Sequence, residues 1–221
     1  MARSVVYQST VRCEHCRFTL RWCICAGFQS VDSTLRVDVL MHWREFDRPT
    51  STGRLVNRVM SGSRCHLFRP GGNMARESIA RPGRELLILH PRGESLPVGT
   101  RADQVQVLLL DGSWRESVQM AQAVTTWGRL VRLPAAGPSR NALRRQDAPG
   151  QYATVESLLF LLAALGLSAA ELRLRQQFEL HVYAGLRARG AKAQAEAFLA
   201  TTSLRETQPE LMSRLEQRRP N

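Results

Sequence analysis

Strand-like and helix-like spacings of hydrophobic residues alternate along most of the chain. Residues 105–110 are almost continuously apolar, which is typical of a strand buried on both faces of a parallel sheet. Residues 35–41 alternate apolar and polar side chains, as a half-buried strand does. The strands that these patterns predict are residues 35–41, 65–68, 85–89, 105–110 and 128–133.

Helical spacing fills several of the segments between these strands. The predicted helices run from Thr50 or Ser51 to Gly62, from a capping box of Ser113 and Glu116 onward, and from about Thr154 to Leu165. Because strands and helices alternate, we expect an α/β fold in which a mostly parallel sheet is flanked by helices.

The last quarter of the chain is helical in pattern and rich in charge. A second capping box, Ser168 with Glu171, is expected to open a helix that stops at Gly190. His181 lies beside the apolar stripe of this helix, so we expect it at the boundary of the buried face. A short helix is expected after Pro209. The apolar stripe consists of Leu174, Phe178, Val182 and Leu186. This region is either a packing element or a surface that faces RNA.

The positive net charge of the chain indicates the class of its partner. The 221 residues contain 31 Lys+Arg and 19 Asp+Glu, which gives a net charge of +12, and Lys192 is the only lysine. Arginine binds phosphate bidentately and stacks on bases, so the excess predicts a nucleic-acid partner. A base-composition bias would explain the choice of arginine over lysine but not the excess charge.

Membrane and export signals are weak in this sequence. The apolar run 158–165 falls well short of the roughly 20 residues of a membrane span. Residues 1–10 have no apolar stretch of the kind that a secretory signal requires. We therefore expect a cytoplasmic protein with no membrane partner.

Four of the five cysteines crowd into one short segment near the N-terminus. In a cytoplasmic protein, two close pairs separated by six residues favour a structural zinc site over disulfides or free thiols. His15 is an alternative ligand. Cys65 stands alone in an apolar run and is expected in the core. The predicted zinc ligands are Cys13, Cys16, Cys23 and Cys25.

Polar groups that suit a binding site follow three of the predicted strands. Ligands of α/β proteins bind outside the carboxyl ends of the strands, where the loops after residues 42, 90 and 111 meet. Thr50 and Ser51 either cap a helix or help to bind an anion. Asp111 directly follows a buried strand, where a carboxylate is able to remove a proton or to cap the next helix. Trp114 is either a core residue or the wall of a pocket for a base.

Four motifs occur together in the order typical of one protein family. They are Cys-x2-Cys-x6-Cys-x-Cys from Cys13, His42…Glu45…Arg48-Pro-Thr-Ser-Thr-Gly53, Leu-Leu-Leu-Asp111-Gly-Ser-Trp114 and Thr154-Val-Glu156. Over residues 12–167 the sequence resembles the bacterial DTW-domain tRNA-uridine aminocarboxypropyltransferases. It departs from the family pattern at Ser51 (usually Asn), at Ser113 (usually Thr) and at residues 140–145, where the family's tyrosine is missing.

The resemblance implies a SPOUT-like fold with a trefoil knot that binds S-adenosylmethionine. It also implies transfer of the 3-amino-3-carboxypropyl group of S-adenosylmethionine to N3 of a tRNA uridine, with release of 5′-methylthioadenosine. The chain would then consist of a zinc module (1–33), a catalytic domain (34–167) and a helical C-terminal extension (168–221). SPOUT proteins are often dimers, so a monomer and a homodimer both remain open.

The resemblance also suggests roles for individual residues. Asp111 would act as the catalytic base or orient it. Arginine side chains would contact phosphate or carboxylate groups, divided in an unknown way between cofactor and tRNA. These arginines are Arg48, Arg54, Arg140, Arg144 and Arg145. The cofactor-binding residues would be Thr50, Ser51, Thr52, Gly53, Leu89, Pro91, Leu110, Gly112, Ser113 and Trp114.

Two other functions are compatible with the same residues. A SPOUT methyltransferase would use the same cofactor, because geometry alone decides which carbon of the sulfonium faces the nucleophile. A noncatalytic zinc-containing RNA-binding protein would use only the basic surface. A zinc hydrolase fits poorly, because four thiolates leave no coordination position for water.

Overall fold

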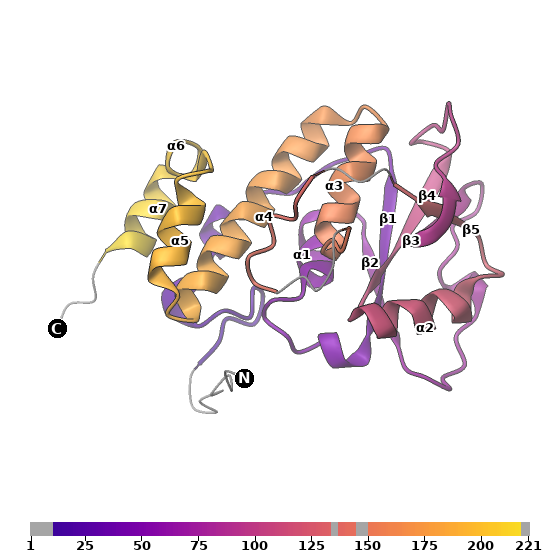
Figure 1. Cartoon of the computed structure of the whole chain (residues 1–221), viewed down its shortest axis with the longest axis horizontal. Helices are drawn as coiled ribbons and strands as arrows, with labels where there is room; N and C mark the ends of the chain where they lie inside the picture. The colour runs from indigo at the N-terminus through magenta and orange to yellow at the C-terminus, as the bar shows by residue number, and fades with distance from the viewer. Residues whose placement is uncertain (1–10, 134–136, 145–149, 218–221) are drawn as a thin grey trace.

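One parallel sheet organises the protein. The computed structural model describes residues 11–133, 137–144 and 150–217. In this part of the chain five strands pair in the order β2-β1-β4-β3-β5, and every pairing is parallel (Figure 1). The predicted α/β class is therefore confirmed, and the knot stays a prediction. The strands are β1 (Arg36–His42), β2 (Arg64–Phe68), β3 (Glu85–Ser95), β4 (Val105–Asp111) and β5 (Arg129–Arg132).

Helices cover both faces of the sheet. α1 and α3 lie against one face, with α4 packed on these two helices, and α2 crosses the other face (Figure 1). Among the described residues the helices are α1 (Thr52–Val59), α2 (Trp114–Val124), α3 (Thr154–Ala164), α4 (Ser168–Ala188), α5 (Lys192–Leu199), α6 (Leu204–Thr207) and α7 (Pro209–Glu216). Short 3-10 turns are η1 (Leu20–Trp22), η2 (Cys25–Gly27), η3 (Trp43–Glu45) and η4 (Arg76–Ser78). None of the described helices is long and apolar enough to cross a membrane.

The central strand β4 is buried on both faces, as its apolar run predicts. Val107 and Leu109 join the larger core under α1, α3 and α4, whereas Leu108 joins the smaller core under α2. Successive side chains of a strand point to opposite faces, so a strand between two helical layers is apolar on both faces, and the one polar side chain inside β4, Gln106, is buried with hydrogen bonds to Asp38 and the Ile79 carbonyl. Asp111 ends this strand at the edge where the carboxyl ends of all five strands meet.

A buried carboxylate ties the other end of the sheet together. Asp38 of β1 accepts hydrogen bonds from Arg64 Nη2 at 3.0 Å, Arg81 Nη2 at 2.9 Å and Gln106 Nε2 at 2.6 Å. Burial opposes its ionisation, but interactions with His66 and the two arginines outweigh burial and hold the pKa of Asp38 well below its usual range.

Strand β3 is longer than its sequence pattern suggests. Leu89 and Glu94 both pair with Val131 of β5, so the residues between them form a bulge inside the strand. A Cβ at Gly93 would lie 2.5 Å from the backbone nitrogen of Val131, so this close approach requires glycine. The prediction of a loop at His90 and Pro91 is therefore wrong, because both residues lie within β3, which pairs with β5 again at Glu94.

Three expectations about single residues are also wrong. Ser168 is the first residue of α4 and Leu167 takes the N-cap position, so the predicted capping box does not form, and Glu171 pairs with Arg175. Cys65 is exposed, because β2 is an edge strand. His181 is buried, with its ring 5.0 Å from that of Phe18, because the N-terminal segment covers this side of α4. The predicted stripe of α4 is buried, and Gly190 follows the helix end with φ +78°.

The C-terminal helices pack on the cysteine-rich segment. Arg21 Nη2 donates to the Leu215 carbonyl at 2.9 Å, and Arg214 Nη2 donates to the Cys23 carbonyl at 3.0 Å. Gln177 of α4 donates to the Gly27 carbonyl at 2.9 Å. Apolar residues from Cys16 to Leu215 belong to the same core cluster, so the two ends of the described chain stabilise each other.

Candidate functional site

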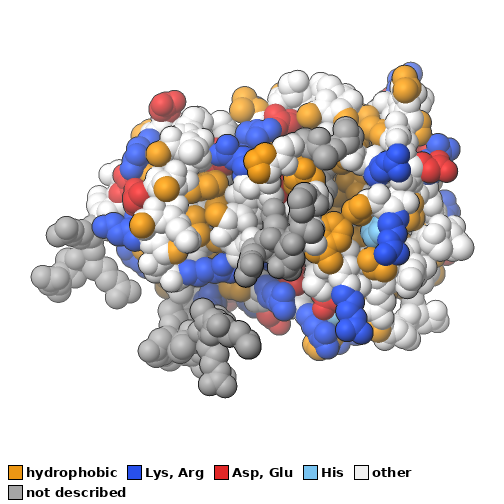
Figure 2. All heavy atoms as spheres, viewed as in Figure 1, with side chains coloured by type: hydrophobic (Ala, Val, Ile, Leu, Met, Phe, Trp, Pro, Cys, Tyr) orange, Lys and Arg blue, Asp and Glu red, His pale blue; other side chains and the backbone are white. Residues whose placement is uncertain are grey.

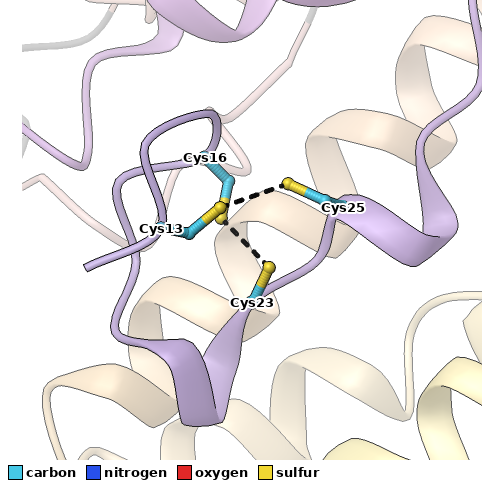
Figure 3. Close-up of side chains that lie close together, drawn as sticks. All are labelled: Cys13, Cys16, Cys23 and Cys25. Atoms are coloured by element: carbon cyan, nitrogen blue, oxygen red, sulfur yellow. Dashed lines mark hydrogen bonds between the residues drawn. The ribbon is translucent and has the colours of Figure 1, made fainter. Parts of the chain in front are cut away.

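The four clustered cysteines form a site that fits zinc. Their sulfur atoms all lie within 4.8 Å of one another, and Figure 3 shows them turned toward a common centre. The Sγ atoms of Cys13 and Cys25 are 3.6 Å apart, and those of Cys16 and Cys23 are 3.8 Å apart. Ligands at the usual Zn–S distance of about 2.3 Å, arranged tetrahedrally, stand about 3.8 Å apart. His15 is not part of this group.

The local backbone prepares this site for a cation. Arg17, which follows Cys16, has φ +63°, and its amide donates to the Cys13 carbonyl at 2.8 Å, so the first pair is held in a tight turn. Burial opposes ionisation of Cys13, but amide hydrogen bonds from Cys16 and His15 outweigh burial and lower the pKa of Cys13 to about 6. Burial raises the pKa of Cys25. A bound cation is what allows all four thiols to ionise together.

A second cluster centres on Asp111 at the end of β4. Its Oδ2 accepts a hydrogen bond from Ser51 Oγ at 2.8 Å. Its Oδ1 accepts from the Gly53 amide at 3.1 Å and from Thr154 Oγ1 at 2.6 Å. The residue is only 2% exposed. Both carboxylate oxygens are thus used inside the protein, and they join the starts of α1 and α3 to the end of β4.

Gly53 makes this close approach possible. A Cβ at this position would lie 2.4 Å from Asp111 Cγ, far inside van der Waals contact. Ser51 also caps α1, since its Oγ accepts from the Arg54 amide at 3.1 Å. The expected capping role of Ser51 is therefore confirmed, and the carboxylate of Asp111 satisfies another amide of the first helical turn.

Glu45 is a second fully buried carboxylate at this edge of the sheet. It pairs with Arg48 Nη1 at 2.7 Å and with Arg144 Nη2. Burial raises its pKa above the usual value, the charge of Arg144 opposes that shift, and the nearby charge of Asp111 adds to it. The ion pair with Arg144 connects the loop before α1 to residues 137–144.

Glu116 organises the start of α2. Its Oε2 accepts from the amide and the hydroxyl of Ser113, both at 2.8 Å, which confirms the predicted capping box. Its Oε1 lies 3.2 Å from His42 Nδ1 and 3.7 Å from Arg44 Nη1. Burial opposes ionisation of Glu116, but the bonds from Ser113 outweigh burial and lower its pKa.

Exposed aromatic rings lie among the arginines of this edge. Trp43 and Trp114 are 41% and 39% exposed, and Arg44 and Arg69 both stack over the Trp43 ring. Figure 2 shows Lys and Arg side chains gathered beside α2 and the turn that precedes α1. A surface of this composition suits stacking and phosphate contact by a nucleic acid.

Glu156 holds the loop that precedes α3. Its carboxylate accepts from Ser139 Oγ at 2.7 Å, from the Arg140 amide at 2.6 Å and from the Ala153 amide at 2.8 Å. Arg140 in turn reaches the C-terminal helices, where its Nη2 lies 3.2 Å from Glu179 Oε1. The side chain of Arg140 therefore connects this loop to α4.

The sequence-predicted residues end up in distinct environments. Ser51, Thr52 and Gly53 are buried, and Thr50 is half-buried. Ser113, Trp114 and Pro91 are exposed, whereas Leu89, Leu110 and Gly112 are half-buried. Arg48 pairs with Glu45, and Arg54 is in the first turn of α1. Arg145 lies outside the described residues.

The sequence assigned no role to several residues of these clusters. Glu45, Glu156 and Thr154 occur in the motifs, but they bind partners that are distant in sequence. His90 is buried, its Nδ1 accepts from the Arg92 amide at 3.2 Å, and its Nε2 has no hydrogen-bond partner among the described residues. The local sequence around His90 does not predict a buried ring nitrogen of this kind.

Comparison with known proteins agrees with this arrangement. A family model of the DTW domain matches residues 10–184, which include the cysteine cluster, the whole sheet and most of α4. The chain therefore belongs to the DTW-domain family, as its four motifs indicated. This membership is consistent with a role in tRNA modification. No solved structure matches the chain.

Proposed function

We propose that this protein is a tRNA-uridine aminocarboxypropyltransferase that uses S-adenosylmethionine and carries a structural zinc ion. One observation carries the proposal. Three of the motifs that define the resemblance meet at a single carboxylate, because Asp111 binds Ser51, Gly53 and Thr154. Residues this far apart in sequence converge where α/β folds bind their ligands.

His90, in the bulge of β3, suits the binding of S-adenosylmethionine. Because Nδ1 of His90 accepts an amide hydrogen bond, the neutral ring carries its proton on the buried Nε2, which has no partner in the part of the chain that the structure describes. Burial and the charge of Arg92 lower the pKa of His90, which favours this neutral donor. A bound molecule that accepts from Nε2 would remove the cost of the unpaired donor. The exposed ring of Trp114 offers a stacking surface at the same edge.

S-adenosylmethionine supplies an electrophilic carbon, and orientation decides which carbon reacts. Asp111 acts in this proposal as a positioning residue, because its oxygens are occupied by three donors of the protein. It holds the loop of residues 48–53 and the start of α3 in fixed register with β4. The arginines and tryptophans of the same edge bind the tRNA.

Mass spectrometry of nucleosides tests the proposal. Unmodified tRNA is incubated with the zinc-loaded protein and S-adenosylmethionine, and the cofactor by-product is read in the same run. We expect a uridine that is heavier by the aminocarboxypropyl group, together with 5′-methylthioadenosine. A methyl gain with S-adenosylhomocysteine would instead establish a methyltransferase, and the absence of any product would leave an RNA-binding protein.

Two variants test the role of His90 in binding S-adenosylmethionine. His90→Phe keeps an aromatic ring but removes the Nε2 donor, so we expect weaker binding of S-adenosylmethionine with unchanged affinity for tRNA. His66→Phe is the matched control, because its buried Nε2 also makes no hydrogen bond to the described residues but lies 3.9 Å from Asp38 Oδ2, away from the Asp111 cluster. Equal loss of cofactor affinity in both variants would contradict the assignment of His90.

A further inference from the structure

A strip of arginine and phenylalanine residues runs along α1 from the Asp111 cluster toward the cysteines. Arg54 and Arg58 are four residues apart in α1, so their side chains lie on the same side of the helix. Each guanidinium stacks on an exposed ring: Arg54 lies 4.9 Å from the Phe46 centroid and Arg58 lies 6.0 Å from the Phe28 centroid. Phe46 and Phe28 are 47% and 43% exposed.

The two guanidinium groups have unused hydrogen-bond donors. Nε and Nη2 of Arg54 and Nε of Arg58 are buried and have no partner in the described part of the chain. No ion pair joins either side chain to a carboxylate among the described residues, and the contact of Arg58 Nη1 with Cys25 Sγ is long, at 4.0 Å. Both guanidinium groups are half-buried, so their charge faces solvent in part without a carboxylate partner among the described residues, and an anionic ligand would supply that partner.

The electrostatic environment of the strip also favours an anion. Burial and the positive charge of Arg17 lower the pKa of Arg54, and its weaker attractions to Asp47, Cys65 and Asp111 do not offset them. Arg17 itself pairs with Asp47 at 2.9 Å. The strip therefore carries positive charge that the protein leaves largely uncompensated.

We propose that Arg54 and Arg58, with Phe46 and Phe28, bind the phosphodiester backbone and unpaired bases of the tRNA substrate. The inference rests on the proposed function, since it assigns the docking path of the same substrate. Guanidinium groups interleaved with exposed aromatic rings are the arrangement with which proteins hold single-stranded nucleic acid. Because Arg58 adjoins Cys25, the zinc module forms one wall of this path and orders the ring of Phe28 beside it.

The test measures the salt dependence of tRNA binding by the full-length, zinc-loaded protein. The probe is an unmodified tRNA transcript with a fluorescent label. The double variant Arg54→Gln, Arg58→Gln should bind about tenfold more weakly at physiological salt, and the slope of log affinity against log salt should be shallower by about 1.4, which is 0.7 for each lost phosphate contact.

A single variant and a control variant complete this measurement. The single variant Arg54→Gln keeps the contact between Arg58 and Cys25. Its slope of log affinity against log salt should be shallower by about 0.7. The charge-matched control Arg101→Gln, Arg173→Gln removes two exposed arginines outside the strip and should leave the slope unchanged. Zinc content and Tm are measured on each protein, so that misfolding is recognised.

Each outcome bears on the inference. An unchanged slope in the Arg54 variants, or an equal change in the control, overturns it. Competition by polyglutamate as strong as that by oligouridylate would also overturn it and indicate a general anion surface. Nucleoside analysis of the wild-type protein is independent of this result. If product forms but the slopes do not change, only the docking path is wrong, whereas slope changes without product contradict only the proposed reaction.

Discussion

The hydrogen bonds of Asp111 allow its structural and chemical roles to be separated. Asp111→Ala removes a buried acceptor from Ser51, Gly53 and Thr154. Bonds to a charged acceptor are worth about 1.5–3 kcal/mol each, and the two hydroxyls can turn to new partners whereas the Gly53 amide cannot. We therefore expect a loss of about 3–5 kcal/mol in the free energy of unfolding. At this chain length the corresponding fall in Tm is about 10 °C.

Asp111→Asn provides the contrast. The amide keeps Oδ1 for Gly53 and Thr154 and replaces only the oxygen that faces Ser51, so one hydrogen bond has to rearrange. We expect it to cost about 1–2 kcal/mol. Urea unfolding of both variants checks these values, and an Ala variant as stable as the wild type would refute the positioning role.

Turnover of the same variants distinguishes positioning from proton transfer. If Asp111 positions the loop of residues 48–53, Asp111→Asn should retain turnover to within about tenfold, because the loop stays attached. Loss of a general base typically lowers the rate by about 10²–10⁴-fold. A fall of that size in Asp111→Asn, with unchanged stability and unchanged binding of tRNA and S-adenosylmethionine, would refute our assignment and identify Asp111 as the base.

Three other predictions follow from buried groups. Metal analysis should find about one zinc per chain, and a chelator should speed hydrogen exchange in α7, which packs on the cysteine segment. Asp38→Asn should be destabilising at neutral pH, and because the pKa of Asp38 is lowered in the folded state, that difference should shrink as the pH falls through about 4 and below; a constant difference would contradict it. Gly53→Ala should lose about 1–3 kcal/mol of unfolding free energy, since its Cβ would overlap Asp111.

Features that depend on neighbours in the chain could be predicted from the sequence. The almost continuous apolar run of β4 and the Ser113–Glu116 capping box are both observed where their patterns placed them. The spacing of the cysteines likewise predicted a cluster with the geometry of a zinc site. In each case the residues that interact are close in sequence or repeat with a regular period.

Features that depend on distant neighbours could not be predicted in this way. His181 lies beside the apolar stripe of α4 and was expected at the boundary of the buried face, yet it is buried because Phe18 packs against it. The bulge of β3 likewise follows from its pairing with Val131, which has no counterpart in the pattern of residues 85–95.

The sequence by itself determined the α/β class, the cysteine cluster, the basic surface and the family to which the chain belongs. Only the tertiary structure decided what surrounds Asp111, because its partners Ser51, Gly53 and Thr154 come from segments that separate strands and helices bring to one edge of the sheet. The tertiary structure likewise leaves Nε of Arg54 and Nε of Arg58 without a hydrogen-bond partner among the described residues. Periodicity and capping act over a few residues, whereas burial and charge pairing depend on which distant segments the fold brings into contact.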